Sequence, residues 1–292
     1  MEVKMRALKL LTRVCSSPSK RMLKKAIRFA HAYGQSLHIY AEDYRRSEEH
    51  TFVDFLLPSQ ESRMRYDDYF MQWCKSILEL VKDIRTETEL PAIEVDFELL
   101  NGTHWEKRLC HIHAEGGDTF LVDYSRGLIA PQLLRELTRK GCHVLLLTEK
   151  KWGQEFKIAA AIDPLHRGDR KAEIDKTIIA NSIELKRNFE ADVTIVYCQF
   201  VAPYLYRYSQ EILKHQKHTI KDFLETNNFH HLSLRLVNAN PEEGLPSCVN
   251  SIGASILVMG ACKRSILSRY WSGSTVDVLL KQAPCDILLI SK

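Results

Sequence analysis

Residues 255–290 read SILVMGACKRSILSRYWSGSTVDVLLKQAPCDILLI. Two short apolar runs, 255–260 and 286–291, flank a candidate helix at 274–282. A continuous apolar run bounded by polar segments predicts a strand that is buried on both faces of a parallel sheet. A strand, a loop, a helix and a second strand form the repeating unit of such a sheet, so this stretch predicts an α/β fold.

Runs of the same kind recur along the whole chain, with amphipathic stretches between them. The other expected strands are 7–14, 37–41, 93–100, 119–123, 142–148, 157–163, 193–198 and 232–237. The other expected helices are 18–33, 61–85, 103–115, 131–140, 169–189, 209–226 and 241–252. Each half of the chain therefore reads as five strands alternating with four helices.

The two halves can be laid on each other. The run 120–122, Phe-Leu-Val, matches 256–258, Ile-Leu-Val, and the run 144–147 matches 287–290. The second half has seven more residues between these two strands than the first. A unit of this length is too long for a solenoid repeat. We interpret it as a domain duplication, with domains at 1–150 and 151–292 and the polar stretch 149–155 as the linker.

Composition narrows the class of protein. Hydrophobic residues make up 45% of the 292 residues and charged residues 27%, as in ordinary soluble proteins. The net charge of +4 is too small to indicate a nucleic-acid partner. No apolar run reaches the roughly 18 residues of a membrane span, and Lys9 and Arg13 interrupt the apolar stretch near the start. We expect a cytoplasmic protein with no membrane and no nucleic-acid partner.

Ligands of open parallel sheets bind beyond the carboxyl ends of the strands. In the second half Asp163 and Pro164 follow the first strand directly, where a carboxylate can accept hydrogen bonds from a ligand. Asp-Pro is also a common turn signal, so an aspartate with a purely local role is the competing interpretation.

The fourth strand of the second half ends at Met259 and Gly260 and is followed by a basic loop. That loop contains Lys263, Arg264 and Arg269 and ends with Gly273, Ser274 and Thr275 at the expected helix start. Backbone N–H groups at a helix start are unpaired, and the helix dipole favours an anion there, so the pattern suits a phosphate. Because Ser and Thr are ordinary N-cap residues, a capped helix after a solvated loop remains open as an alternative.

The residues Gly260, Lys263, Gly273 and Ser274 have the spacing of the G-x2-G-x9-G-[ST] loop of the universal stress proteins, which this chain resembles. Asp163 has the matching aspartate position, and 283–290 resembles that family's junction between the last helix and last strand. The resemblance covers the second half well and the first half as a degraded copy. The length and duplication are most similar to the tandem, UspE-like members.

The resemblance implies two Rossmann-like domains of the adenine nucleotide alpha hydrolase type, each a five-stranded parallel sheet of order 3-2-1-4-5 with helices on both faces. It also implies ATP, with Mg²⁺ accompanying it, in the C-terminal domain. Asp163 and Pro164 would lie at the nucleoside, Cys198 would line the adenine site through its backbone, and Met259 and Gly260 would approach the ribose. The phosphates would be held by Lys263, Arg264, Gly273, Ser274 and Thr275.

The chain departs from the family pattern in two places. Lys263 replaces the middle glycine, and a residue with a Cβ costs about 1–2 kcal/mol if that position needs a positive φ. In the first half, Arg13 is followed by Val14 and not by an aspartate, and no spaced glycines follow Asp123. We therefore predict that the first domain does not bind ATP in the family manner.

The preferred interpretation is a non-catalytic stress-response protein that binds ATP or another small ligand in its C-terminal domain. No catalytic constellation and no metal site are expected, although the family also allows weak ATP hydrolysis. We expect the two domains to pack as a pseudo-dimer, the chain to form a homodimer, and an unidentified protein partner. Two alternatives remain: an interaction protein whose site is filled by Lys263, and a carrier of a non-nucleotide ligand in the N-terminal domain.

Overall fold

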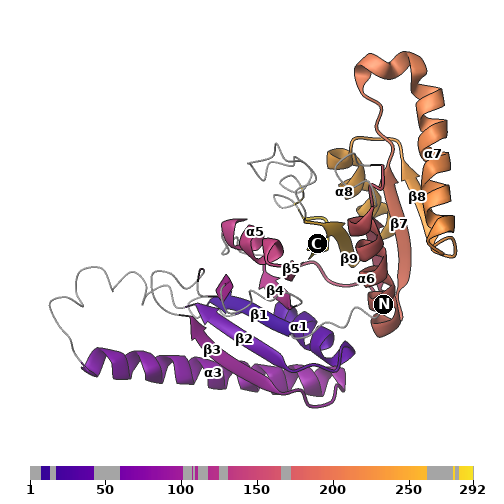
Figure 1. Ribbon diagram of the computed structural model, residues 1–292. Helices are drawn as coiled ribbons and strands as arrows, with labels where there is room; N and C mark the ends of the chain where they lie inside the picture. Colours follow the sequence, from indigo (N-terminus) through magenta and orange to yellow (C-terminus); the bar gives the residue numbers. More distant parts are fainter. Residues whose placement is uncertain are drawn as a thin grey trace. The chain divides into compact units, whose positions relative to one another are not determined.

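We describe a computed structural model of the chain (Figure 1). The described residues are 8–13, 18–42, 60–100, 107, 109–110, 118–124, 131–165, 172–261, 279 and 283–291. The chain divides into two compact units, one spanning Lys4–Glu149 and the other containing Lys150–Lys292.

The N-terminal unit is an open parallel sheet flanked by helices. Its elements are β1 (Leu8–Arg13), α1 (Lys20–Ala32), β2 (Leu37–Glu42), α3 (Gln60–Thr88), β3 (Val95–Leu100), β4 (Thr119–Asp123), α5 (Pro131–Arg139) and β5 (His143–Leu147). The strand order is β3-β2-β1-β4-β5, and every neighbouring pair is parallel. The expected order 3-2-1-4-5 is confirmed for this unit.

The C-terminal unit repeats this arrangement. Its elements are β6 (Lys157–Ala161), α6 (Glu173–Phe189), β7 (Asp192–Cys198), the 3-10 helix η1 (Pro203–Tyr208), α7 (Ser209–Thr226), β8 (Ser233–Val237), α8 (Pro241–Ile252), β9 (Ile256–Gly260) and β10 (Asp286–Ile290). The order β8-β7-β6-β9-β10 is again 3-2-1-4-5 with parallel pairs. The duplication seen in the sequence is therefore a duplication of the fold.

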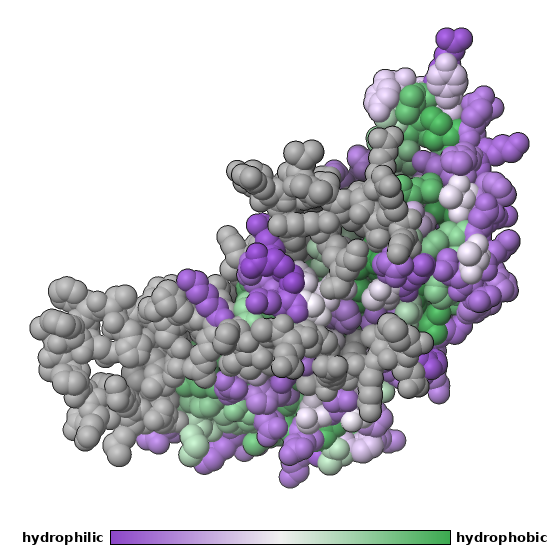
Figure 2. All heavy atoms as spheres, viewed as in Figure 1, coloured by the Kyte–Doolittle hydropathy of each residue, from purple (hydrophilic) through white to green (hydrophobic). Residues whose placement is uncertain are grey.

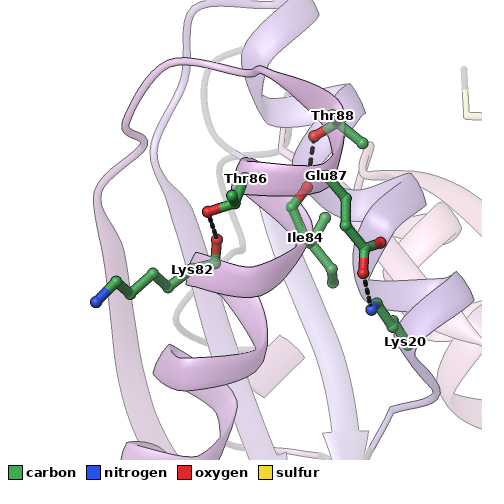
Figure 3. A network of polar contacts seen from close by, with 6 residues as sticks. All are labelled: Lys20, Lys82, Ile84, Thr86, Glu87 and Thr88. Carbon is green, nitrogen blue, oxygen red and sulfur yellow. Dashed lines mark hydrogen bonds and ion pairs between the residues drawn. The ribbon is translucent and has the colours of Figure 1, made fainter.

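Helix packing in the N-terminal unit follows from amphipathic sequences. Helix α1 begins after Ser19, whose side chain accepts a hydrogen bond from the backbone N–H of Met22 at 3.2 Å, as an N-cap does. The ring of Trp73 in α3 meets Phe97 of β3 edge-on at 5.9 Å. Lys20 pairs with Glu87 between α1 and α3 (Figure 3), which lowers the pKa of the Glu87 carboxyl. Both side chains of this pair are exposed, so its contribution to stability is small.

The segment expected as a linker is partly packed onto the C-terminal unit. The Trp152 indole N–H donates to the Asp286 carboxylate at 2.7 Å, and the Trp152 ring meets Phe156 edge-on at 4.8 Å. Lys150 donates to the backbone oxygen of Pro284 at 2.6 Å. These contacts attach the start of the unit to the start of its last strand, β10.

The segment η1–α7 contributes little to the core of its unit. Helix α7 buries only Ile220 and Leu224 among its residues, and η1 buries none. Three tyrosines of η1 are exposed: Tyr204, Tyr206 and Tyr208. Figure 2 shows a mainly hydrophilic surface along α7 with hydrophobic residues beside it.

Candidate functional site

The carboxyl ends of β6 and β7 bring the expected nucleoside residues together. The backbone N–H of Ile162 donates to Val196 of β7 at 3.1 Å, so the ladder between these strands continues one residue beyond β6. Asp163 and Pro164 come next and are half-buried. Cys198 ends β7, the strand beside β6, and is also half-buried.

Burial and charge set the protonation state of the side chains near Asp163. Burial, together with the nearby Cys248 and Asp163, raises the pKa of the Cys198 thiol to about 11. Burial and the Asp163 carboxylate also raise the pKa of the Tyr197 phenol. The Cys198 thiol is therefore neutral at pH 7 and is not an activated nucleophile. At this edge the Cys198 thiol and the Tyr197 phenol are neutral beside the Asp163 carboxylate, which suits hydrogen bonding to a polar, uncharged part of a ligand.

A fully buried aspartate in α6 holds the end of β6. The Asp175 carboxylate accepts a hydrogen bond from the backbone N–H of Asp163 at 2.7 Å, and Asp175 has 0% exposure. The sequence analysis did not identify Asp175, because an acidic residue in the first turn of a helix is usually a surface residue that favours the helix dipole. The signal that could have identified it is its position on the apolar face of α6, beside Ile174 and Ile178.

Helix α8 packs closely against the same edge. A Cβ on Gly244 would lie 3.0 Å from Val237 Cγ1, 3.1 Å from Ala239 Cβ and 3.3 Å from Cys198 Sγ. A Cβ here would therefore push these neighbours outward, and the glycine lets α8 lie this close to Cys198 without that shift. The sequence alone did not indicate this role for Gly244.

The ends of β9 and β10 complete the described edge. Met259 is buried and Gly260 half-buried at the end of β9, and Gly260 is in register with Ile290 of β10. The backbone N–H of Ala261 donates to Ile290 at 2.9 Å, so the ladder continues past Gly260. Because β9 pairs with β6, Gly260 lies at the same edge of the sheet as Asp163.

Half of the expected site therefore lies in the described part of the chain. The structure places Asp163, Pro164, Cys198, Met259 and Gly260 at the carboxyl edge of β6, β7 and β9. The expected phosphate residues Lys263, Arg264, Gly273, Ser274 and Thr275 lie outside the described residues.

The carboxyl edge of the N-terminal unit is built differently. Lys25 of α1, with 3% exposure, donates to the backbone oxygen of Thr148 at 2.8 Å just after β5. Asp123, at the end of β4 and in register with Leu147, is also buried. This edge therefore contains a buried ammonium group supplied by the protein itself.

Two negative findings concern the described part of the chain. No cluster of three or more His, Cys, Asp or Glu side chains suited to a metal ion was found there. None of its helices combines the length and the apolar character that crossing a membrane requires.

Comparisons with known proteins agree with this architecture. Residues 173–291 match the Universal stress protein family. The matched residues include most of the C-terminal unit and the motif in 260–274. No curated protein matches the sequence.

Solved structures share the fold of the whole chain. A functionally unknown protein from Pseudomonas aeruginosa PAO1 aligns with a TM-score of 0.67 and 17% identity, over 99% of this chain and 94% of its own. A putative universal stress protein from Pseudomonas aeruginosa UCBPP-PA14 aligns with a TM-score of 0.68 at the same identity and coverage. A universal stress protein from Archaeoglobus fulgidus aligns with a TM-score of 0.60 and 10% identity, over 97% of this chain and 98% of its own. At these identities the alignments establish the two-unit fold.

Proposed function

We propose that the C-terminal unit binds an adenine nucleotide, with ATP as the ligand and Mg²⁺ accompanying it, and that the protein acts by binding and not by catalysis. The observation that carries this proposal is the position of Asp163. Its carboxylate follows the central strand β6, at the edge where β7 and β9 also end, which is where open parallel sheets hold nucleotides.

The described residues suit the nucleoside part of the ligand. Asp163 would accept hydrogen bonds from ribose hydroxyls, since a carboxylate is a strong acceptor. The neutral thiol and the backbone of Cys198 would line the base, and Gly260, which has no side chain, would allow the ribose to approach the backbone.

The sequence supplies the phosphate part. Gly273, Ser274 and Thr275 would offer backbone N–H and hydroxyl donors, while Lys263 and Arg264 add positive charge. The six cysteines in the described part of the chain form no disulfide, which suits the reducing environment of the cytoplasm.

The experiment that tests this function is the release of bound nucleotide from purified protein. The protein is denatured, and the supernatant is separated by ion-exchange chromatography beside an Asp163→Ala variant and an Asp192→Asn control. Asp192 is exposed at the amino end of β7, so its substitution leaves the site intact. We expect ATP or AMP from the wild type and the control and none from Asp163→Ala.

Absence of nucleotide, together with no thermal shift on adding millimolar Mg-ATP, would contradict the proposal. That result would favour the second candidate, an interaction protein in which the Lys263 ammonium group takes the place of a ligand. The observation that favours this candidate is the lysine at the position of the motif's middle glycine.

A further inference from the structure

The most unusual group near the proposed site is the carboxylate of Asp175. It is fully buried in α6, which packs against β6 and β9, and its Oδ1 lies 2.7 Å from the backbone nitrogen of Asp163. A hydrogen bond from an N–H to a buried carboxylate is stronger than a neutral one. Burying a carboxylate nevertheless costs several kcal/mol by general estimates, so a residue of this kind calls for an explanation.

We propose that Asp175 is the positioning residue of the nucleotide site: it holds the backbone of Asp163, so that the Asp163 side chain is presented to the ligand. This inference rests on the proposed function. Asp175 itself does not touch the nucleotide in this account. It acts through the end of β6, whose direction after Ile162 decides where the Asp163 carboxylate points.

A comparison of the two units supports this role, beginning with the strands. Leu10 of β1 pairs with Leu121 of β4, and Ala159 of β6 pairs with Leu257 of β9. Because Leu121 and Leu257 match in the duplication, Leu10 and Ala159 occupy equivalent positions. The residue that corresponds to Asp163 is therefore Val14, which cannot accept a hydrogen bond from a ligand through its side chain.

The helices show the same change. The buried positions of α1 recur in α6 after a shift of 152 residues, from Met22 to Ile174, from Ala26 to Ile178, from Ile27 to Ile179 and from Ala30 to Ser182. In this alignment Leu23 corresponds to Asp175. Leu23 is fully buried and apolar. The unit that lacks the aspartate after its first strand thus also lacks the buried carboxylate behind it.

A purely structural role for Asp175 does not explain why Asp163 and Asp175 occur together in one unit and are both replaced in the other. Leu23 shows that the same fold forms with an apolar side chain at this position. Replacing a buried charged group by an apolar one is often neutral or stabilising. Asp175 also does not cap its helix, because the N-cap residue is Ala172 and Asp175 faces the sheet. The hydrogen bond to Asp163 is what distinguishes it from Leu23.

The test combines amide exchange with binding. Asp175→Leu introduces the residue type of the N-terminal unit, and Asp175→Asn keeps an oxygen that can accept the bond. For Asp175→Leu we expect faster exchange of the Asp163 amide by NMR and affinity for Mg-ATP about tenfold weaker, because the Asp163 carboxylate is no longer held toward the ligand. We expect little change in Tm, since an apolar side chain can replace a buried charged one without loss of stability. For Asp175→Asn we expect both properties to stay close to the wild type.

Two controls separate the outcomes. Glu173→Gln removes an exposed carboxylate from the same helical turn and should change neither property. Asp163→Ala should abolish binding while its own amide stays protected. Should the leucine variant not fold, Asp175→Ala takes its place.

An Asp175→Leu protein with unchanged Asp163 exchange and unchanged affinity would overturn the positioning role while leaving the proposed function standing. A loss of Tm and affinity together in the leucine, alanine and asparagine variants would overturn it as well, because that is the result of a structural role. A wild type that binds no Mg-ATP would contradict the proposed function instead, and the exchange data would then still decide whether Asp175 holds Asp163.

Discussion

At the scale of single residues, the two units bury different polar side chains in their interiors. The C-terminal unit buries Asp175 behind the end of β6, whereas the N-terminal unit buries Lys25 against Thr148 after β5. Each buried group has a hydrogen-bond partner, as the cost of burying charge requires. The two units thus share a fold but differ in the polar side chains that they bury near the carboxyl edge of the sheet.

One buried histidine predicts a pH dependence of stability. Burial lowers the pKa of His143, at the start of β5, to about 4, below its ordinary value of 6.5. Between these two values the unfolded chain binds a proton that the folded chain does not, so stability falls as the pH drops from about 6.5 to 4. The expected loss is about 3 kcal/mol, at 1.36 kcal/mol per pKa unit.

The measurement is chemical denaturation of the wild type and of His143→Gln at several pH values. Glutamine does not titrate, so the difference in unfolding free energy between the two proteins should change across pH 4–6.5 and stay constant above pH 7. Parallel stability curves over the whole range would show that His143 is not the cause.

At the scale of elements, the close contact of α8 with β7 depends on one glycine. Replacing Gly244 by valine adds atoms where a Cβ alone already lies 3.0 Å from Val237 Cγ1. We expect the Gly244→Val variant to be less stable by about 1–3 kcal/mol, as is typical of overpacking. It should also bind Mg-ATP more weakly, because Cys198 has to move.

Thermal unfolding and titration with Mg-ATP test this expectation against Ser247→Val. Ser247 is exposed in the same helix, so a valine there changes helix propensity without overpacking the interior. Equal stability of the two variants would show that the α8–β7 contact can open at no cost.

The elements themselves were largely predictable from the sequence. The expected helices 209–226 and 241–252 agree with α7 and α8. The apolar runs predicted the strands of both sheets, because buried strands need continuous apolar residues.

The site was predictable only in part. Asp163 and Gly260 stand at strand ends, which a linear pattern shows, whereas the contacts of Asp175 and Gly244 depend on tertiary packing. A first-turn aspartate and a helical glycine have no distinctive signature in a single sequence.

At the scale of the whole molecule, two copies of one fold differ at the position that follows the central strand. Both units have the order 3-2-1-4-5, yet only the C-terminal unit carries an aspartate after its central strand. The N-terminal unit places the buried Lys25 at its carboxyl edge instead. The central claim is therefore that each chain has one nucleotide site, and that it lies in the C-terminal unit.

The most direct test is equilibrium dialysis of the full chain against labelled Mg-ATP, after any bound nucleotide has been removed. We predict saturation at about one nucleotide per chain, as one site requires, and no binding by Asp163→Ala. Two nucleotides per chain, one nucleotide retained in Asp163→Ala, or no binding by the wild type would each contradict the claim.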